Sequence, residues 1–161
     1  MEKFKIEIKW AILFTVFFII WTLSEKTLGF HDTNIKNQMI ISYLYTIPMI
    51  AMYIFEHSDK NKNSYHNTIN FSQGFVSGCY FSLFICILSP MAQYICFELI
   101  SPNYFKNAIQ YVVATKVMTL ENATNYFSLK SYIIQGAFSG LSFGIITSAI
   151  VAYFLQTKIK K

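Results

Sequence analysis

Arginine is missing from this 161-residue sequence, and all thirteen basic residues are lysine, against eight acidic residues. Arginine is the side chain best suited to bind phosphate and carboxylate groups through paired hydrogen bonds. Its absence argues against a protein built to recognise nucleic acid, and we expect no nucleic-acid partner. The formal net charge of +5 is better explained by lysines lying at an anionic membrane surface.

Charged residues of either sign are scarce, at 13% of the chain, whereas soluble domains carry about 25%. Hydrophobic residues make up 54% of the sequence, and sixteen Phe and eleven Tyr are among them. The mean hydropathy is +0.40. This balance argues against a soluble helical domain and favours an integral membrane protein with lipid as its partner.

Cysteine is rare, and neither it nor histidine forms a recognisable site. The three cysteines lie in one apolar run with no Cys-x-x-Cys pair, and an odd number argues against a disulfide framework. His57 and His66 stand nine residues apart in a polar stretch, where we interpret them as surface residues. No paired acids and no nucleophile beside a base stand out. We therefore expect no metal, no cofactor and no catalytic residues.

Long apolar runs are what the sequence has in abundance. A helix needs about 20 residues to cross a bilayer, and four stretches qualify: residues 10–29, 39–55, 74–99 and 131–156. The stretch 56–70 is polar and predicts a solvated loop. The predicted fold is all-α, an integral membrane bundle of four transmembrane helices that forms a single domain over residues 1–161.

Residues 102–129 separate the third and fourth spans. Ser101-Pro102 is a typical helix start, and Thr119 predicts a second one. Apolar residues recur here at helical spacing among polar ones. The pattern predicts an amphipathic helical segment that lies at the membrane interface or over the mouth of the bundle.

Small residues recur every fourth position in the third and fourth spans. Residues four apart share one helix face, and small faces let two helices approach closely in lipid. The predicted packing residues are Gly74, Gly78, Ser82, Gly136, Gly140, Gly144 and Ser148. The sequence leaves open whether these faces meet within one chain or between two.

Three polar residues in or near the spans, Gln93, Glu98 and Gln135, are candidates for functional groups, because polar residues inside a membrane are costly. Orientation follows from the distribution of lysine. The side that holds both termini carries Lys3, Lys5, Lys9, Lys60, Lys62, Lys158, Lys160 and Lys161. The other side carries Lys26, Lys36, Lys106, Lys116 and Lys130. We therefore expect both termini in the cytoplasm of a bacterial inner membrane.

Two stretches carry a resemblance to a known family: "INFSQGFVSG" at the start of the third span and "YICFELISPNYF" at its end. The matching positions are Phe71, Gly74, Gly78, Tyr94, Ser101, Pro102, Asn103 and Tyr104. With the order of spans, they make the chain resemble the four-span membrane family catalogued as domain of unknown function 4199, found mainly in Bacteroidota. The segment after Pro102 is shorter and more apolar than is usual there. The resemblance implies architecture and location and supplies no mechanism.

Two functions follow from these observations. The first is a non-enzymatic scaffold or accessory membrane protein, packed through its small-residue faces, with a second copy or another membrane protein as a possible partner. The alternative is a small solute or ion transporter or pore that acts as an oligomer, for which Gln93, Glu98 and Gln135 would supply the polar groups. An intramembrane enzyme is a third class, and no motif supports it.

Overall fold

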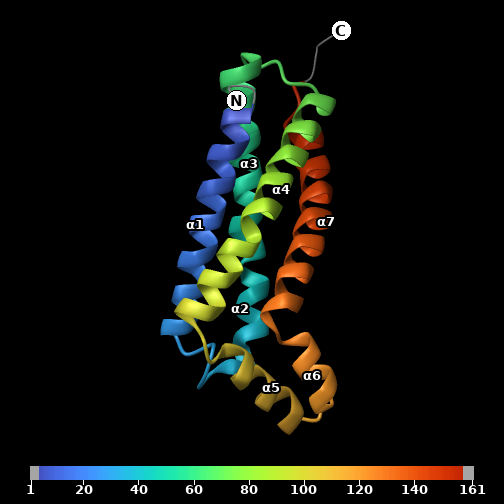
Figure 1. Cartoon of the computed structure of the whole chain (residues 1–161). Helices are drawn as coiled ribbons and strands as arrows, with labels where there is room; N and C mark the ends of the chain where they lie inside the picture. Colours follow the sequence, from blue (N-terminus) through green and yellow to red (C-terminus); the bar gives the residue numbers. More distant parts are fainter. Residues whose placement is uncertain (1–3, 158–161) are drawn as a thin grey trace.

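The computed structural model describes residues 4–157 as four long helical stretches side by side, with two short helices across one end (Figure 1). The α-helices are α1 (Lys5–Thr27), α2 (Gln38–Leu44), α3 (Thr46–Tyr65), α4 (Phe71–Tyr94), α5 (Tyr104–Ala114), α6 (Leu120–Tyr126) and α7 (Leu129–Leu155). A 3₁₀ turn, Ile35–Asn37, precedes α2, and a π-helical turn, Ile95–Ile100, follows α4. Lys3, Lys158, Lys160 and Lys161 lie outside the described residues.

Four stretches are long and apolar enough to cross a membrane: Lys5–Thr27, Ile35–Tyr65, Phe71–Ile100 and Leu129–Leu155. Large apolar side chains cover their outer faces, as Phe138 and Phe154 show with 75% and 74% of their surface exposed. Such faces suit lipid rather than water. The predicted fold class, an all-α bundle of four membrane spans, is confirmed.

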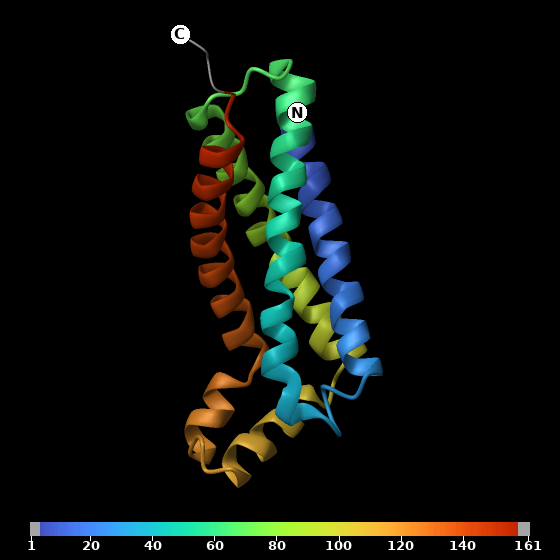
Figure 2. The same cartoon turned by 180° about the vertical axis from the view of Figure 1, so that it is seen from behind.

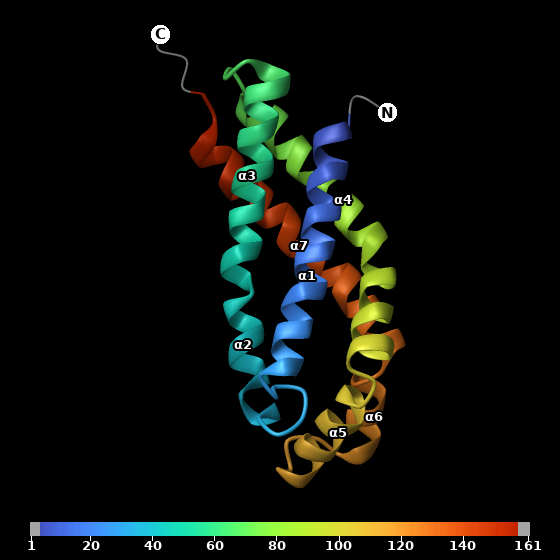
Figure 3. The ribbon, with the colours of Figure 1, turned by 90° about the vertical axis from the view of Figure 1, so that its left-hand side faces the viewer.

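Helix α4 is the centre of the bundle, because its contacts with α7 and with α1 are the two most extensive between helices. Seen from behind, α2 and α3 run in front of α4, with α7 and α1 on either side (Figure 2). From the side, α7 crosses obliquely behind α1 and α4 (Figure 3). The start of α1 and the end of α7 lie at the same end of the bundle, here called the termini end (Figure 1).

Small residues form the contact between α4 and α7 at the termini end. A Cβ atom on Gly78 would overlap the side chain of Ser148, and one on Gly144 would overlap Ser82 and the hydroxyl of Tyr53. Both serines donate to carbonyls of their own helix, Ser82 to Gly78 at 2.8 Å and Ser148 to Gly144 at 2.6 Å. The two small-residue faces therefore meet within the chain.

Gly140 departs from this pattern. No heavy atom among the described residues lies within 4 Å of where its Cβ would stand, so the predicted contact at Gly140 does not form inside the chain. The reason is local: Gly140 borders a hollow between the helices, whereas Gly144, one turn later, and Gly136, one turn earlier, both meet side chains of α4.

The polar stretch after residue 55 is helix, and its prediction as a solvated loop was wrong. Helix α3 continues to Tyr65, with Glu56, His57 and Lys60 exposing only 1%, 2% and 7% of their surfaces. These side chains contact other helices instead of water; His57, for example, packs against Gly74 of α4. The chain turns only at His66 and Asn67, which have positive φ values of 48° and 64°. The predicted surface position of His57 was therefore also wrong.

The predicted segment between the last two spans consists of α5 and α6. The side chain of Thr119 accepts from the backbone of Asn122 at 3.3 Å, which confirms the predicted start of α6. The start of α5 differs, because Asn103 precedes its first turn and the hydroxyl of Ser101 bonds elsewhere. Tyr104 anchors α5 by packing under the end of α4.

Candidate functional site

A cavity occupies the half of the bundle away from the termini. It consists of two adjoining hollows of about 660 and 500 Å³. The two hollows share the lining residues Phe18, Tyr43, Tyr45, Gln93, Gly136 and Ser139. They therefore adjoin each other between α1, α2, α3, α4 and α7, with α5 and α6 at the far end, and are here called the cavity.

The local sequence explains why this space stays open. At Gly136 and Gly140, α7 has no side chain that could fill the space. On the opposite wall, the helix breaks between α2 and α3 at Tyr45. Pro48 stands just after that break, and a proline has no N–H to continue the hydrogen bonding of the preceding turn.

The cavity opens to the outside between α2 and α7. Met39 and Tyr43 on α2 line it and expose 66% and 71% of their surfaces, and Phe143 on α7 lines it with 44% exposed. These residues are apolar or aromatic and belong to membrane-spanning stretches. The opening therefore faces the lipid phase.

Two polar atoms in the lining residues have no hydrogen-bond partner among the described residues: the Gln93 side-chain oxygen and the Tyr45 hydroxyl. The amide nitrogen of Gln93 faces Gly136 and lies 2.9 Å from the position that a Cβ atom on Gly136 would take. Gln135 also lines the cavity, and its amide donates to Ser131 at 2.7 Å. A mainly apolar space thus contains a few polar groups, of which two are unsatisfied.

Toward the termini the cavity is closed. Tyr53 on α3, Ile85 on α4 and Phe143 on α7 are its lining residues nearest that end. The hydroxyl of Tyr53 lies 2.8 Å from that of Ser82, and its ring packs on Phe81 with centroids 4.7 Å apart. Because both rings are almost fully buried, no space continues past them.

Aromatic side chains of α5 and α7 close the opposite end. Tyr104 packs against Phe97, and its hydroxyl lies 3.0 Å from that of Tyr132. Burial raises the pKa of Tyr104 to about 12, so its hydroxyl keeps its proton at neutral pH. It therefore acts here as a neutral hydrogen-bonding group.

Sequence reasoning missed a buried Ser–His–Glu arrangement beside this end. His31 lies 2.8 Å from the hydroxyl of Ser101 through Nδ1, and 3.2 Å from Glu25 through Nε2. All three side chains are at least nine-tenths buried. Neither His31 nor Ser101 lines the cavity, so a substrate has no space beside the hydroxyl. The arrangement ties the end of α1 to the start of α5.

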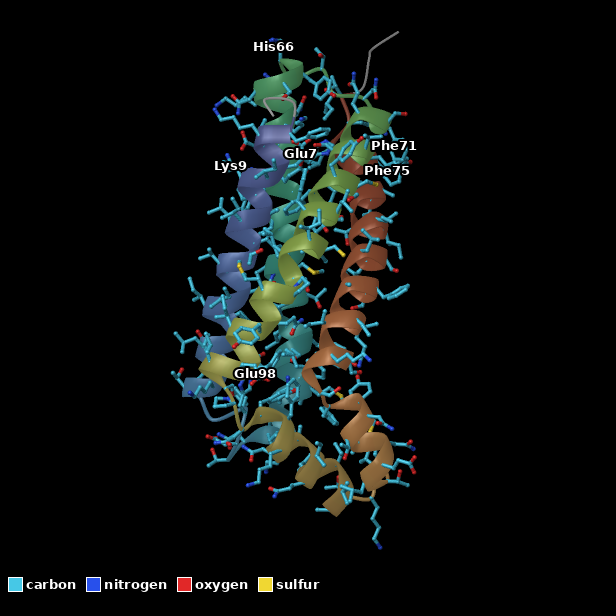
Figure 4. The ribbon with its side chains drawn as sticks, in the orientation of Figure 1. Glu7, Lys9, His66, Phe71, Phe75 and Glu98 are labelled. Carbon is cyan, nitrogen blue, oxygen red and sulfur yellow. The ribbon has the colours of Figure 1, made fainter. Side chains whose placement is uncertain are left out.

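The remaining sequence candidates divide between two places. Gly74, Gly78, Ser82, Gly144 and Ser148 lie in helix contacts at the termini end, and Gly136 and Gly140 line the cavity. Gln93 and Gln135 line the cavity too. Glu98 is exposed on the π-helical turn after α4 and is not among the cavity residues (Figure 4).

Within residues 4–157, no three His, Cys, Asp or Glu side chains are grouped to hold a metal ion. Glu25 and His31 form a pair, and His31 also contacts the hydroxyl of Ser101.

Comparison with known proteins gives one match. The sequence model of a family described as "Protein of unknown function (DUF4199)" matches residues 9–157, nearly the whole chain. Neither the curated proteins nor the solved structures contain a match. The match agrees with the resemblance carried by the third span and its end. Because the match covers nearly the whole chain, this chain belongs to the DUF4199 family, whose function is not known.

Proposed function

We propose that this protein is a non-enzymatic accessory protein of the membrane, and that its cavity holds an amphipathic molecule taken from the lipid phase. The cavity between α2 and α7 is the observation that supports the proposal. Its two hollows fall within the range of about 300–1,000 Å³ typical of ligand sites. We place the protein in a bacterial inner membrane with both termini in the cytoplasm, as the distribution of lysine favours.

The chemistry of the lining favours a molecule with a long apolar part and one polar group. Most lining side chains are aromatic or aliphatic, which suits an acyl chain. The Gln93 oxygen needs a donor, and the Tyr45 hydroxyl can donate or accept. A buried unsatisfied polar group costs about 1–3 kcal/mol. A hydroxyl or amine of the bound molecule would remove that cost at Gln93.

The absence of catalysis is part of this proposal. The only Ser–His–Glu arrangement among residues 4–157 that the hydrogen bonds reveal has its serine hydroxyl 2.8 Å from His31 and away from the cavity. A molecule in the cavity would meet Glu25 of this group, but not Ser101. Binding is therefore better supported than hydrolysis.

Photocrosslinking tests the proposal. The full chain is reconstituted with a phospholipid whose acyl chain carries a diazirine, and crosslinked peptides are mapped by mass spectrometry. We expect crosslinks concentrated on the peptides of α2 and α7 that contain Tyr43 and Ser139. Gly140→Phe should fill the cavity and remove these crosslinks, because open space surrounds Gly140.

The matched control is Ile146→Phe, which places the same ring on the outer face of α7, where Ile146 is 60% exposed. It should leave the crosslinks of the cavity unchanged. Crosslinks spread evenly over all exposed faces, or equal loss in both variants, would contradict the proposal.

A small-solute transporter is the second candidate, and the polar groups of the cavity favour it. Gln93 and Gln135 line a space inside the bundle, and polar side chains within membrane-spanning helices often mark a substrate path. Solute flux into protein-containing vesicles tests this function. Because Glu98 lies outside the cavity, Glu98→Gln should not alter any flux, whereas Gln93→Leu should reduce it. Vesicles in which the wild-type protein supports no flux would exclude transport.

A further inference from the structure

A second polar cluster lies at the termini end, outside the cavity. It joins Glu7 of α1, Glu56 and Lys60 of α3, and Ser77 of α4, which expose 1%, 1%, 7% and 3% of their surfaces. Figure 4 labels Glu7 at the same end of the bundle as His66 and far from Glu98. Ser77 lies five residues before Ser82, or about 7.5 Å along the helix, so the cluster stands beyond the closed end of the cavity.

The hydroxyl of Ser77 connects two carboxyl groups. It lies 2.8 Å from Oε1 of Glu7 and 2.7 Å from Oε1 of Glu56. A serine hydroxyl has one proton to donate, and an ionised carboxylate can only accept. If both glutamates were ionised, one of these two short contacts would have no proton between its oxygens. The geometry thus requires one more proton in the group.

Lys60 decides which glutamate carries that proton. Its ammonium nitrogen lies 2.7 Å from the same Oε1 of Glu7, and a nearby positive charge favours an ionised carboxylate. Glu56 is then the protonated acid: it donates to the Ser77 hydroxyl, which donates to Glu7. This order satisfies both short contacts and avoids burying a second negative charge beside the first.

A further polar atom of this group has no partner. Oε2 of Glu7 is buried and has no hydrogen-bond partner among residues 4–157, so the group keeps one free acceptor atom. Nearby on α1 and α3, Lys9 and Trp10 both donate to Asp59. His57 packs against Gly74 of α4. The residues of α7 that lie beside this part of α4 are Ser148 and Ala152, neither of which is charged.

We propose that Glu7, Ser77 and Glu56 form a buried proton-binding site that holds one proton, carried by Glu56. The proposal is independent of what fills the cavity, because the two sites share no residue. A protonated carboxylic acid has a carbonyl stretching band distinct from that of a carboxylate, and the band shifts in heavy water.

Infrared spectroscopy of the full chain in lipid nanodiscs at neutral pH tests the site. We expect the carboxylic acid band in the wild type, its loss in Glu56→Gln, and its retention in Glu98→Gln, which changes an exposed glutamate as a matched control. A wild-type spectrum without the band, or a band that persists in Glu56→Gln, would overturn the proposal.

Thermal unfolding of two variants provides an independent test. A glutamine at position 56 can donate to Ser77 as the protonated acid does, so Glu56→Gln should keep the wild-type melting temperature. Glu7→Gln removes the carboxylate from the buried Glu7–Lys60 pair, and breaking such a pair should lower the melting temperature by roughly 10 °C. Equal destabilisation by both variants would show that the two glutamates carry the same charge and would overturn the assignment.

Discussion

The two halves of this bundle are built from the same small residues and end up opposite in character. At the termini end, Gly74, Gly78 and Gly144 meet side chains of neighbouring helices so closely that a Cβ atom would not fit. In the other half, Gly140 on the same helix as Gly144 has nothing within 4 Å. A small residue therefore either brings helices together or leaves space between them, and the surrounding packing decides which.

Polar groups differ between the halves in what surrounds them. In the closed half, at the termini end, Ser77 contacts two carboxyl groups, and the unpartnered atoms of Glu7 and His57 lie among packed helices. In the open half, around the cavity, the unpartnered atoms of Gln93 and Tyr45 belong to residues that line a space. The closed half is thus suited to stability, and the open half to binding.

The largest effect should come from filling the closed half. Gly78→Leu forces a side chain into the space of Ser148, and such overpacking costs about 1–3 kcal/mol or more. Thermal unfolding in detergent should show a melting temperature several degrees lower. An unchanged value would mean that α4 and α7 do not touch at this level.

Ser77→Ala should have the next largest effect. It removes the hydroxyl that contacts Glu7 and Glu56, and leaving a buried polar group without its partner costs about 1–3 kcal/mol. Chemical unfolding measures the loss. Ser139→Ala is the control, because Ser139 is exposed in the open half and should change stability little. Similar losses at both serines would remove the distinction between the halves.

Tyr53→Phe should have a smaller effect at the boundary between the halves. It removes the hydroxyl that lies 2.8 Å from Ser82 while keeping the ring, at a cost of about 1 kcal/mol. Ser82 keeps its bond to the Gly78 carbonyl. When all variants are compared in one unfolding measurement, the loss of stability of Tyr53→Phe should lie between those of Ser139→Ala and Gly78→Leu. A larger loss of stability than that of Gly78→Leu would show that the Tyr53 hydroxyl matters more for stability than the close contact between α4 and α7.

The sequence predicted the fold class well because hydrophobic runs of bilayer length dominate the chain. Its four-residue spacing pointed to the residues that lie between α4 and α7. The sequence-based prediction failed at Glu56, His57 and Lys60, which were interpreted as part of a solvated loop. Their partners lie on α1 and α4, far away in the sequence. Only the folded chain pairs them.

The cavity was beyond sequence reasoning for a related reason. Gln93 and Gln135 could be selected as polar residues in apolar spans, but the space beside them depends on how far α7 lies from α2. Glu98 was selected by the same rule and lies outside the cavity, because composition does not say which face of a helix turns inward. His31 and Ser101 are 70 residues apart and meet only through the fold.

The same substitution made one helical turn apart tests the division into a closed and an open half most directly. Leucine replaces glycine in Gly144→Leu and in Gly140→Leu, and thermal unfolding is compared in the same detergent. We predict a melting temperature several degrees below the wild type for Gly144→Leu, because its side chain would overlap Ser82 and Tyr53. Gly140→Leu should match or slightly exceed the wild type, since leucine favours helix and the space is open. Equal destabilisation by both variants would contradict the division.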